Sequence, residues 1–202
     1  LISFNNLQIN MLPSIIFSFL IGGAYSIQFM GYEAVGECKE LNYDDTFNFS
    51  SFPPKQYIMT YADVPGTEYV DGVVMNVKPD YSHPATYKIK ADVHLFDSKR
   101  LVSSYEIAVL NPGAFQERHP DPSGTDKTFY MILLAEIPEC DAYVYYRCSF
   151  QGTNPTDVIN VIKDNKQPLS DECLAKVDEI TRSTPLNVAP TRTLPYNLNN
   201  YK

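Results

Sequence analysis

The sequence predicts an all-β protein of about eight antiparallel strands followed by one α-helix. Three observations support this prediction. Apolar and polar residues alternate with a period of two from about residue 55 to residue 165. Short polar turns join the alternating segments, and no helical pattern lies between any two of them. A single segment, over 170–183, changes to the helical period.

Residues 1–26 are expected to be a translated leader followed by a signal peptide. Met11 is a suitable start, and the apolar run over 12–23 has the length of a signal-peptide core. This run is shorter than the roughly 20 residues that span a bilayer. Ala24 and Ser26 are small, so cleavage is expected after Ser26. The alternative is a buried core helix, whereas a signal peptide predicts a secreted protein without membrane insertion.

The composition argues against several classes of partner. A net charge of −8 without basic clusters argues against nucleic acids and anionic membranes. Four cysteines without a close pair argue against a zinc or redox site. In an oxidising compartment they predict two disulfides, with three possible connectivities. The three histidines are scattered, so no metal site is expected, and Asn48 in Asn-Phe-Ser is a candidate glycosylation site.

The strands follow from alternation, which is clearest between Tyr87 and Leu95, where every second residue is apolar. The segment over 114–119 is a candidate for one short further strand. Consecutive strands joined by short turns must pair antiparallel, which fits either an up-and-down barrel or a sandwich. The expected strands cover 56–64, 68–79, 86–96, 101–110, 114–119, 128–137, 142–150 and 156–164.

The helix expected over 170–183 has its own local signals. Ser170 is a suitable N-cap, and acidic residues in the first turn favour the helix dipole. Apolar residues recur at helical spacing, and Pro185 marks the end. The segment over 186–202 is rich in proline and asparagine, so it is expected to be a flexible tail.

Two stretches resemble the lipocalin family. Residues 135–148, AEIPECDAYVYYRC, resemble its Asp-Tyr turn leading into a strand that ends in cysteine. Residues 156–180 are similar to its eighth strand and the following helix. The likeness is greatest to the invertebrate pigment-binding members, namely bilin-binding proteins, insecticyanins and crustacyanin subunits. It implies an eight-stranded antiparallel up-and-down β-barrel over 27–185, with one C-terminal α-helix packed on its wall.

The N-terminal signature departs from the family pattern. Lipocalins have Gly-x-Trp on the first strand, whereas this chain has Lys55 and Tyr57 there and contains no tryptophan. In the family an arginine covers that tryptophan at the barrel floor. The resemblance therefore suggests that Tyr57 replaces the ring and that Arg147 or a lysine supplies the cation.

The resemblance also implies a cysteine pairing. The family joins an N-terminal cysteine to the end of the seventh strand, which here means Cys38–Cys148. The remaining pair is Cys140–Cys173, which would fix the helix to the turn before the same strand.

A lipocalin barrel encloses a cavity for a small hydrophobic ligand, so the inward faces of the strands supply the candidate lining residues. The lining is apolar with several phenol groups, which suits a long apolar molecule with a few oxygens. The likeness to pigment carriers makes a carotenoid or bilin the first choice, followed by a fatty acid, retinoid or sterol. The lining residues expected are Met59, Tyr61, Tyr87, Ile89, Ala91, Val93, Leu95, Ser103, Tyr105, Ile107, Phe129, Met131, Leu133, Tyr143 and Tyr145.

Three alternative functions compete with ligand carriage. The sequence has no nucleophile elbow, HExxH motif or glycine-rich phosphate loop, so neither catalytic residues nor a catalytic cofactor are expected. The stretch over 111–127 is long for a hairpin connection, which suggests a protein-binding or inhibitor loop or a loop that partly covers the barrel mouth. A secreted storage protein is the last alternative. A homo- or hetero-oligomer, as in the pigment-carrying relatives, is compatible with the sequence.

Overall fold

The computed structural model describes most of the barrel, the helix and part of the C-terminal segment. The described residues are 25–29, 32–36, 38–39, 41, 54–63, 67–120, 124, 126–149, 156–165, 167–186, 188 and 190–197. Most of the expected leader and signal peptide, and the sequon at Asn48, lie outside them. Within this part of the chain, no helix has the length and apolar character needed to span a membrane.

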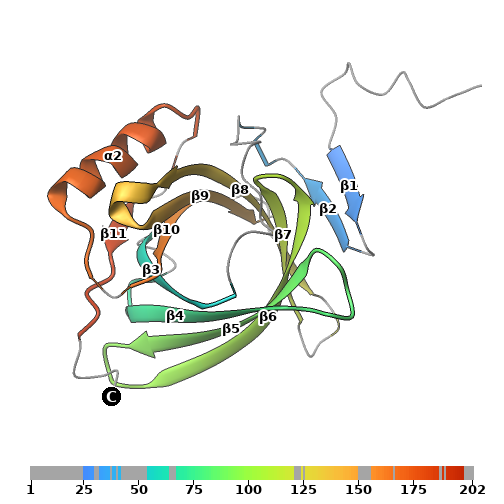
Figure 1. The fold of residues 1–202 in the computed structure, drawn as a ribbon, viewed down its shortest axis with the longest axis horizontal. Coiled ribbons are helices and arrows are strands. Elements are labelled where there is room, and N and C mark those ends of the chain that lie inside the picture. The colour runs from blue at the N-terminus through green and yellow to red at the C-terminus, as the bar shows by residue number, and fades with distance from the viewer. Residues whose placement is uncertain are drawn as a thin grey trace, which may run out of the picture.

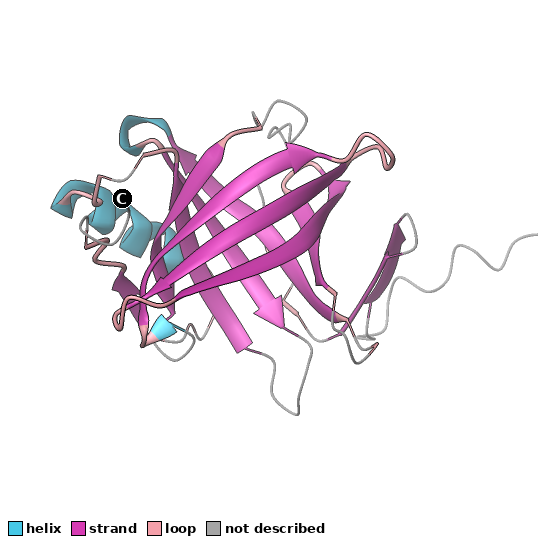
Figure 2. Ribbon diagram, turned by 90° about the horizontal axis from the view of Figure 1, so that it is seen from below, coloured by secondary structure: helices cyan, strands magenta, loops and turns pink. Residues whose placement is uncertain are grey.

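The fold is an eight-stranded antiparallel closed β-barrel with one C-terminal α-helix (Figures 1 and 2). Strands β3 to β10 pair in sequence order, and β10 also pairs with β3, so the sheet closes on itself. Closure confirms the barrel and rules out the sandwich. The strands are β3 (Gln56–Asp63), β4 (Val70–Pro79), β5 (Thr86–Leu95), β6 (Arg100–Asn111), β7 (Ala114–His119), β8 (Lys127–Ile137), β9 (Ala142–Ser149) and β10 (Thr156–Lys163).

Several of the described elements lie outside the barrel wall. Strands β1 (Tyr25–Phe29) and β2 (Tyr32–Gly36) form a separate antiparallel hairpin beside it (Figure 1). A short 3-10 helix, η2 (Pro138–Cys140), fills the turn between β8 and β9.

Strand β7 lies in the middle of the stretch that was expected to be a long loop. It pairs with β6 on one side and with β8 on the other. The turn before it is tight because Gly113 adopts a positive φ of 75°, a conformation that costs glycine little. Residues 114–119 are therefore part of the wall, which confirms the candidate strand over these residues. The expectation of a recognition or covering loop over 111–127 is wrong for them.

A β-bulge in β3 changes which side chains face inward. Val161 of β10 pairs with Tyr61, but the next residue, Ile162, pairs with Met59, so Thr60 is an extra residue on β3. An extra residue reverses the alternation beyond it. Tyr61, which was expected to line the cavity, therefore packs against the outer cluster beneath the helix. Its hydroxyl accepts a hydrogen bond from Thr191.

The helix α2 (Asp171–Arg182) packs on the outside of the wall, close to the expected bounds. Ser170 caps it, because its Oγ accepts a hydrogen bond from the backbone N–H of Cys173 at 3.2 Å. Val177 is fully buried against an outer cluster that includes Ile159 and Val161 of β10. The outward face of this part of the barrel is therefore a second core.

Two disulfides attach the flanking segments to β9 and to the turn before it. Cys38 pairs with Cys148 near the end of β9, and Cys140 in η2 pairs with Cys173 in α2. This is the pairing that the lipocalin resemblance implies. Both bridges join distant parts of the chain, so they restrict the unfolded state and stabilise the docked helix.

Residues 191–197, here called the C-terminal strap, fill a gap in the barrel wall. Strand β3 pairs with β4 through Gln56–Met59, and beyond Met59 its free edge pairs with β11 (Thr191–Thr193). Leu194 and Tyr196 are then buried in the interior cluster. The flexible tail expected over 186–202 is therefore wrong for the strap, which is held by strand pairing and burial.

The Tyr196 hydroxyl joins the two strands where they separate. It lies 2.6 Å from the carbonyl oxygens of both Met59 and Val73, and it accepts a hydrogen bond from the backbone N–H of Val73 at 2.9 Å. Asp71 adds a second anchor, because its carboxylate accepts from the backbone N–H of Asn197 at 3.2 Å. One phenol thus satisfies backbone groups from both β3 and β4.

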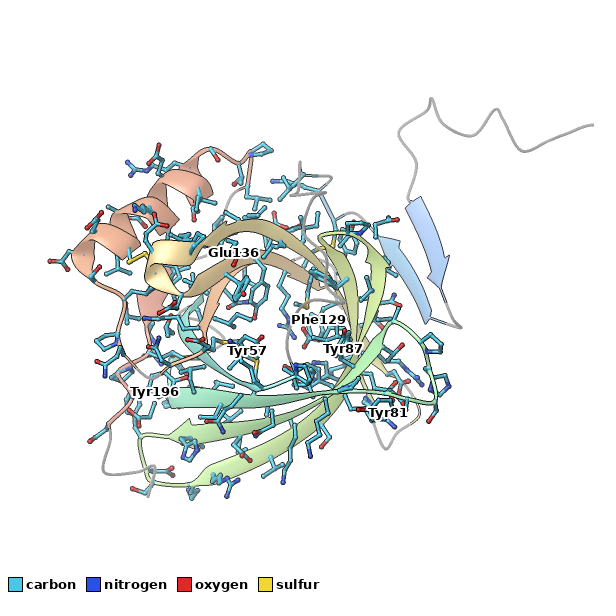
Figure 3. The ribbon with its side chains drawn as sticks, in the orientation of Figure 1. Tyr57, Tyr81, Tyr87, Phe129, Glu136 and Tyr196 are labelled. Carbon is cyan, nitrogen blue, oxygen red and sulfur yellow. A yellow bond between two sulfur atoms is a disulfide. The ribbon has the colours of Figure 1, made fainter. Side chains whose placement is uncertain are left out.

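The change Tyr196→Phe should therefore destabilise the protein by about 1–3 kcal/mol, because it leaves buried backbone groups without a partner. Urea unfolding of wild type and variant would measure the loss. Tyr81→Phe is the matched control, since Tyr81 is 94% exposed and lies outside the barrel (Figure 3). Equal free energies of unfolding for the two variants would contradict the role given to the strap.

Candidate functional site

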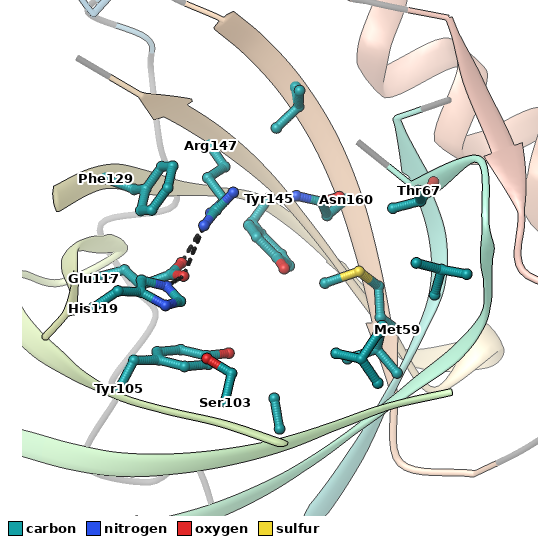
Figure 4. Close-up of a pocket in the computed structure, with 15 residues that line it drawn as sticks. Met59, Thr67, Ser103, Tyr105, Glu117, His119, Phe129, Tyr145, Arg147 and Asn160 are labelled. Atoms are coloured by element: carbon teal, nitrogen blue, oxygen red, sulfur yellow. Dashed lines mark hydrogen bonds and ion pairs between the residues drawn. The ribbon is translucent and has the colours of Figure 1, made fainter. Parts of the chain in front are cut away.

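The barrel interior contains a cavity of about 460 Å³. Its lining comes from all eight strands of the barrel and from Thr67 before β4. One side is apolar and is built by β3, β4 and β5. The opposite side, built by β6 to β10, carries most of the polar side chains (Figure 4). The apolar side consists of Met59, Val70, Val73, Ala91 and Val93.

Most of the expected lining residues lie around this cavity or a smaller one next to it. Met59, Ala91, Val93, Ser103 and Phe129 line the large cavity. The smaller cavity, of about 60 Å³, lies toward the other end of the barrel and shares Tyr105 and Tyr145 with the large one. Among the expected residues, those that line the small cavity alone are Ile89, Ile107, Met131, Leu133 and Tyr143.

The remaining expected residues line neither cavity. Tyr87 is buried in the interior cluster, and Leu95 packs against the same cluster. Tyr61 lies on the outer side because of the bulge in β3. Alternation therefore located the interior face correctly except where the strand register shifts.

A charged cluster of Glu117, Arg147 and His119 faces the large cavity (Figure 4). The Arg147 guanidinium donates two hydrogen bonds to the Glu117 carboxylate, from Nε to Oε2 at 3.0 Å and from Nη2 to Oε1 at 2.8 Å. His119 Nε2 also contacts Oε1 of this carboxylate. A two-point contact of this kind fixes the orientation of the guanidinium plane.

Aromatic rings hold the charged cluster in place. The Arg147 guanidinium carbon lies 3.4 Å from the centroid of the Phe129 ring. The His119 ring stacks on Tyr105 with centroids 4.3 Å apart, and its distance to the Phe129 ring is 5.4 Å, edge to face. Stacking and cation–π contact favour these positions over solvent-exposed rotamers.

Strand register explains why these residues meet. Glu117 on β7 lies opposite Phe129 on β8, and Arg147 on β9 lies opposite Met131 on β8. Glu117 and Arg147 therefore face each other across one strand on the inward side. The sequence contained a signal for this, because Phe115, Glu117 and His119 alternate on one face of β7. It was missed because charged residues are normally assigned to the solvent side.

The ion pair sets the protonation state of the cluster. Burial alone would raise the pKa of Glu117, but the charge of Arg147 and the hydrogen bonds from His119 and Arg147 lower it to about 2. Burial alone would lower the pKa of the Arg147 guanidinium, but the charge of Glu117 and its hydrogen bonds raise this pKa above its usual value. Burial, followed by the charge of Glu117, raises the pKa of Tyr105 well above its usual value. At neutral pH the Glu117–Arg147 pair is therefore ionised, and Tyr105 keeps its proton.

The floor of the barrel differs from the expected pairing of Tyr57 with Arg147. Tyr57 is completely buried, and the cation over its ring is Lys55, with Nζ 5.2 Å from the centroid. Lys55 also forms an ion pair with Asp164 at 2.9 Å. Arg147 lies in the large cavity instead, because its strand position is close to Phe129 and Glu117. The sequence analysis proposed either Arg147 or a lysine as the cation over Tyr57, and this cation is Lys55.

Among the residues that the structure describes, no group of His, Cys, Asp and Glu side chains could hold a metal ion. The side chains that line the large cavity offer hydrogen bonding, charge and apolar contact.

No family model matches the sequence, and no curated protein matches it. The barrel is nevertheless similar to solved structures. Rat lipocalin 12 from epididymis superposes with a TM-score of 0.55 at 8% identity, over 70% of this chain and 81% of that chain. The siderocalin Ex-FABP superposes with a TM-score of 0.51 at 6% identity, over 70% of this chain and 89% of that chain.

The chain has the lipocalin fold. These similarities concern the fold and establish no particular subgroup. Lobster apocrustacyanin A1 superposes with a TM-score of only 0.47 at 12% identity, over 69% of this chain and 74% of that chain. The expected kinship with invertebrate pigment carriers stays a prediction.

The change Glu117→Gln should destabilise the protein by about 3 kcal/mol, because Arg147 then lies in the interior without a counter-ion. The double variant Glu117→Gln/Arg147→Gln should be more stable than this single variant, since two amides replace the ion pair. Urea unfolding measures both. Glu106→Gln on the outward face of β6, with its carboxylate 3.8 Å from Arg118, is the control and should change little. An unchanged free energy of unfolding in Glu117→Gln would contradict the stabilising role of the Glu117–Arg147 pair.

Stability should fall in acid through Glu117. Folding lowers its pKa from 4.5 to about 2. Its contribution to the free energy of unfolding is therefore complete above about pH 4.5 and is lost as the pH falls through about 2. Between about pH 6 and pH 3 the wild type should lose about 2 kcal/mol more than Glu117→Gln does. Unfolding at the two pH values measures the difference. Identical losses would show that Glu117 has an ordinary pKa.

Proposed function

We propose that this protein binds a small, largely apolar ligand reversibly inside the barrel and carries it. The observation that supports the proposal is the cavity of about 460 Å³ inside a closed barrel, apolar on one side and polar on the other. Its volume lies within the range of pockets that bury most of a small ligand. Burial of apolar surface against Met59, Val73 and Val93 would provide the main binding free energy.

The shape of the interior favours a ligand with one narrow end. The two cavities share Tyr105, Glu117 and Tyr145, so they are neighbours along the barrel. The smaller one has a volume of about 60 Å³, which is room for about two water molecules. This space can hold the end of an alkyl chain but not a ring system. A fatty acid or a retinoid fits this description better than a sterol does.

A chromophore is the second candidate, because aromatic rings surround the large cavity. Tyr105, Phe129, Tyr145 and His119 can stack on a conjugated system. The volume is nearer the lower than the upper limit of the usual range, which favours a compact pigment over a full-length carotenoid. A carotenoid or a bilin would give purified native protein a visible absorption band, and mass spectrometry of its organic extract would identify the molecule.

The two disulfides support a role as an extracellular carrier. Two disulfides persist in an oxidising compartment and are rare in the cytosol. The signal peptide, glycosylation at Asn48, and a homo- or hetero-oligomer stay predictions. The absence of enzymatic activity is likewise a prediction from the sequence.

Neighbouring serines on β6 provide a matched test of binding. Ser103 lines the cavity, whereas Ser104 is exposed on the outer face. Ser103→Trp should fill the cavity and reduce retinol binding at least tenfold, while Ser104→Trp should bind like wild type. Retinol fluorescence measures binding, and tryptophan emission reports the burial of the only tryptophan in each variant. Equal retinol binding by the two variants, or none by the wild type, would refute carriage in this cavity.

A further inference from the structure

Arg147 keeps hydrogen-bond donors that Glu117 does not use. Its Nε and Nη2 donate to the Glu117 carboxylate, while Nη1 has no acceptor among the described residues. The side chain is 25% exposed and lines the large cavity. A guanidinium N–H group in a partly buried site is costly without an acceptor. Arg147 therefore favours a ligand with an acceptor, and most of all one with negative charge.

Asn160 is a second polar group directed at the same space. It is only 3% exposed and lines the large cavity, where Figure 4 shows its side chain pointing inward from β10. In the described part of the chain, no residue forms a hydrogen bond with its amide. An amide in the cavity wall offers both a donor and an acceptor to a ligand inside the barrel.

Strand register places these two groups close together. Asn160 on β10 lies directly opposite Tyr145 on β9. Arg147 is two residues beyond Tyr145 and faces the same way. It is therefore the diagonal neighbour of Asn160, a separation of roughly 7–8 Å between backbones. The register therefore places Arg147 and Asn160 on the same inward face, as neighbours in the lining of one cavity.

The charge of the cluster selects the sign of the ligand. Glu117 already has two partners, Arg147 and His119. The negative charge of Glu117 is matched by Arg147, so the cluster has no net negative charge whether His119 is neutral or charged. An ammonium group would have to displace Arg147 from Glu117, which would leave a guanidinium without its counter-ion. The cavity therefore disfavours amines.

We propose that the ligand carries a carboxylate, which binds between Arg147 Nη1 and the Asn160 amide while its apolar body contacts the side built by β3 to β5. This inference rests on the proposed function, because it names the chemical class that the cavity takes. A single guanidinium edge with one neutral donor matches a planar monoanion better than a phosphate. Glu117 is a positioning residue, because it holds the guanidinium plane through two hydrogen bonds.

A series of ligands with one chain and different head groups tests the proposal. Binding of lauric acid, dodecanol and dodecylamine to the full-length protein is measured by isothermal titration calorimetry at neutral pH. The acid should bind about tenfold more tightly than the alcohol, and the amine should bind most weakly. Equal binding of acid and alcohol, or tighter binding of the amine, would overturn the carboxylate site but leave the proposed function intact. No binding by any of the three would refute both.

Two variants locate the site. Asn160→Leu keeps the side-chain size and removes the amide. It should therefore weaken the binding of lauric acid several-fold and leave the binding of dodecanol unchanged. Glu117→Gln/Arg147→Gln removes the cation without leaving a lone charge, and it should abolish the preference for the acid. Arg118→Gln is the matched control, because Arg118 lies on the outward face of β7 and pairs with Asp126 there. An acid preference that survives in the double variant, or disappears in Arg118→Gln, would place the carboxylate elsewhere.

Discussion

Closure of the sheet between β3 and β10 is the constraint on which the rest of the structure depends. Once β10 pairs with both β9 and β3, every inward side chain faces the same enclosed space. A closed barrel of this strand number has room for side chains and one small ligand. Glu117 and Arg147, on β7 and β9, meet across β8 on the side of the wall that faces that space. The fold thus produces the cavity and its polar lining together.

Much of the fold was predictable because period-two alternation is a direct consequence of a wall with two different faces. The inward positions Ile89, Ala91 and Val93 could be assigned without knowledge of the partner strands. Ser170 likewise indicated the start of the helix. These features depend on local sequence, and local sequence was sufficient for them.

The parts that could not be predicted depend on pairing between distant strands. Nothing in the sequence of β3 indicates that Thr60 is an extra residue, because the bulge appears only in the register with β10. Glu117 resembles an ordinary surface residue until β8 and β9 place Arg147 beside it. The position of Lys55 over Tyr57 also depends on packing at the floor. A buried ion pair makes the interior less apolar and costs desolvation free energy. Here the same ion pair orients a hydrogen-bond donor toward the cavity.

The C-terminal strap has a consequence for how the molecule is assembled during synthesis. Tyr196 follows Val73, to which it bonds, by 123 positions, and every strand of the barrel precedes it in the chain. All eight strands of the barrel are therefore synthesised before the strap that fills the gap between β3 and β4. Contacts over such distances in sequence are slow to form. Until the strap is synthesised, the edge of β3 beyond Met59 lacks the partner strand that it has in the folded protein.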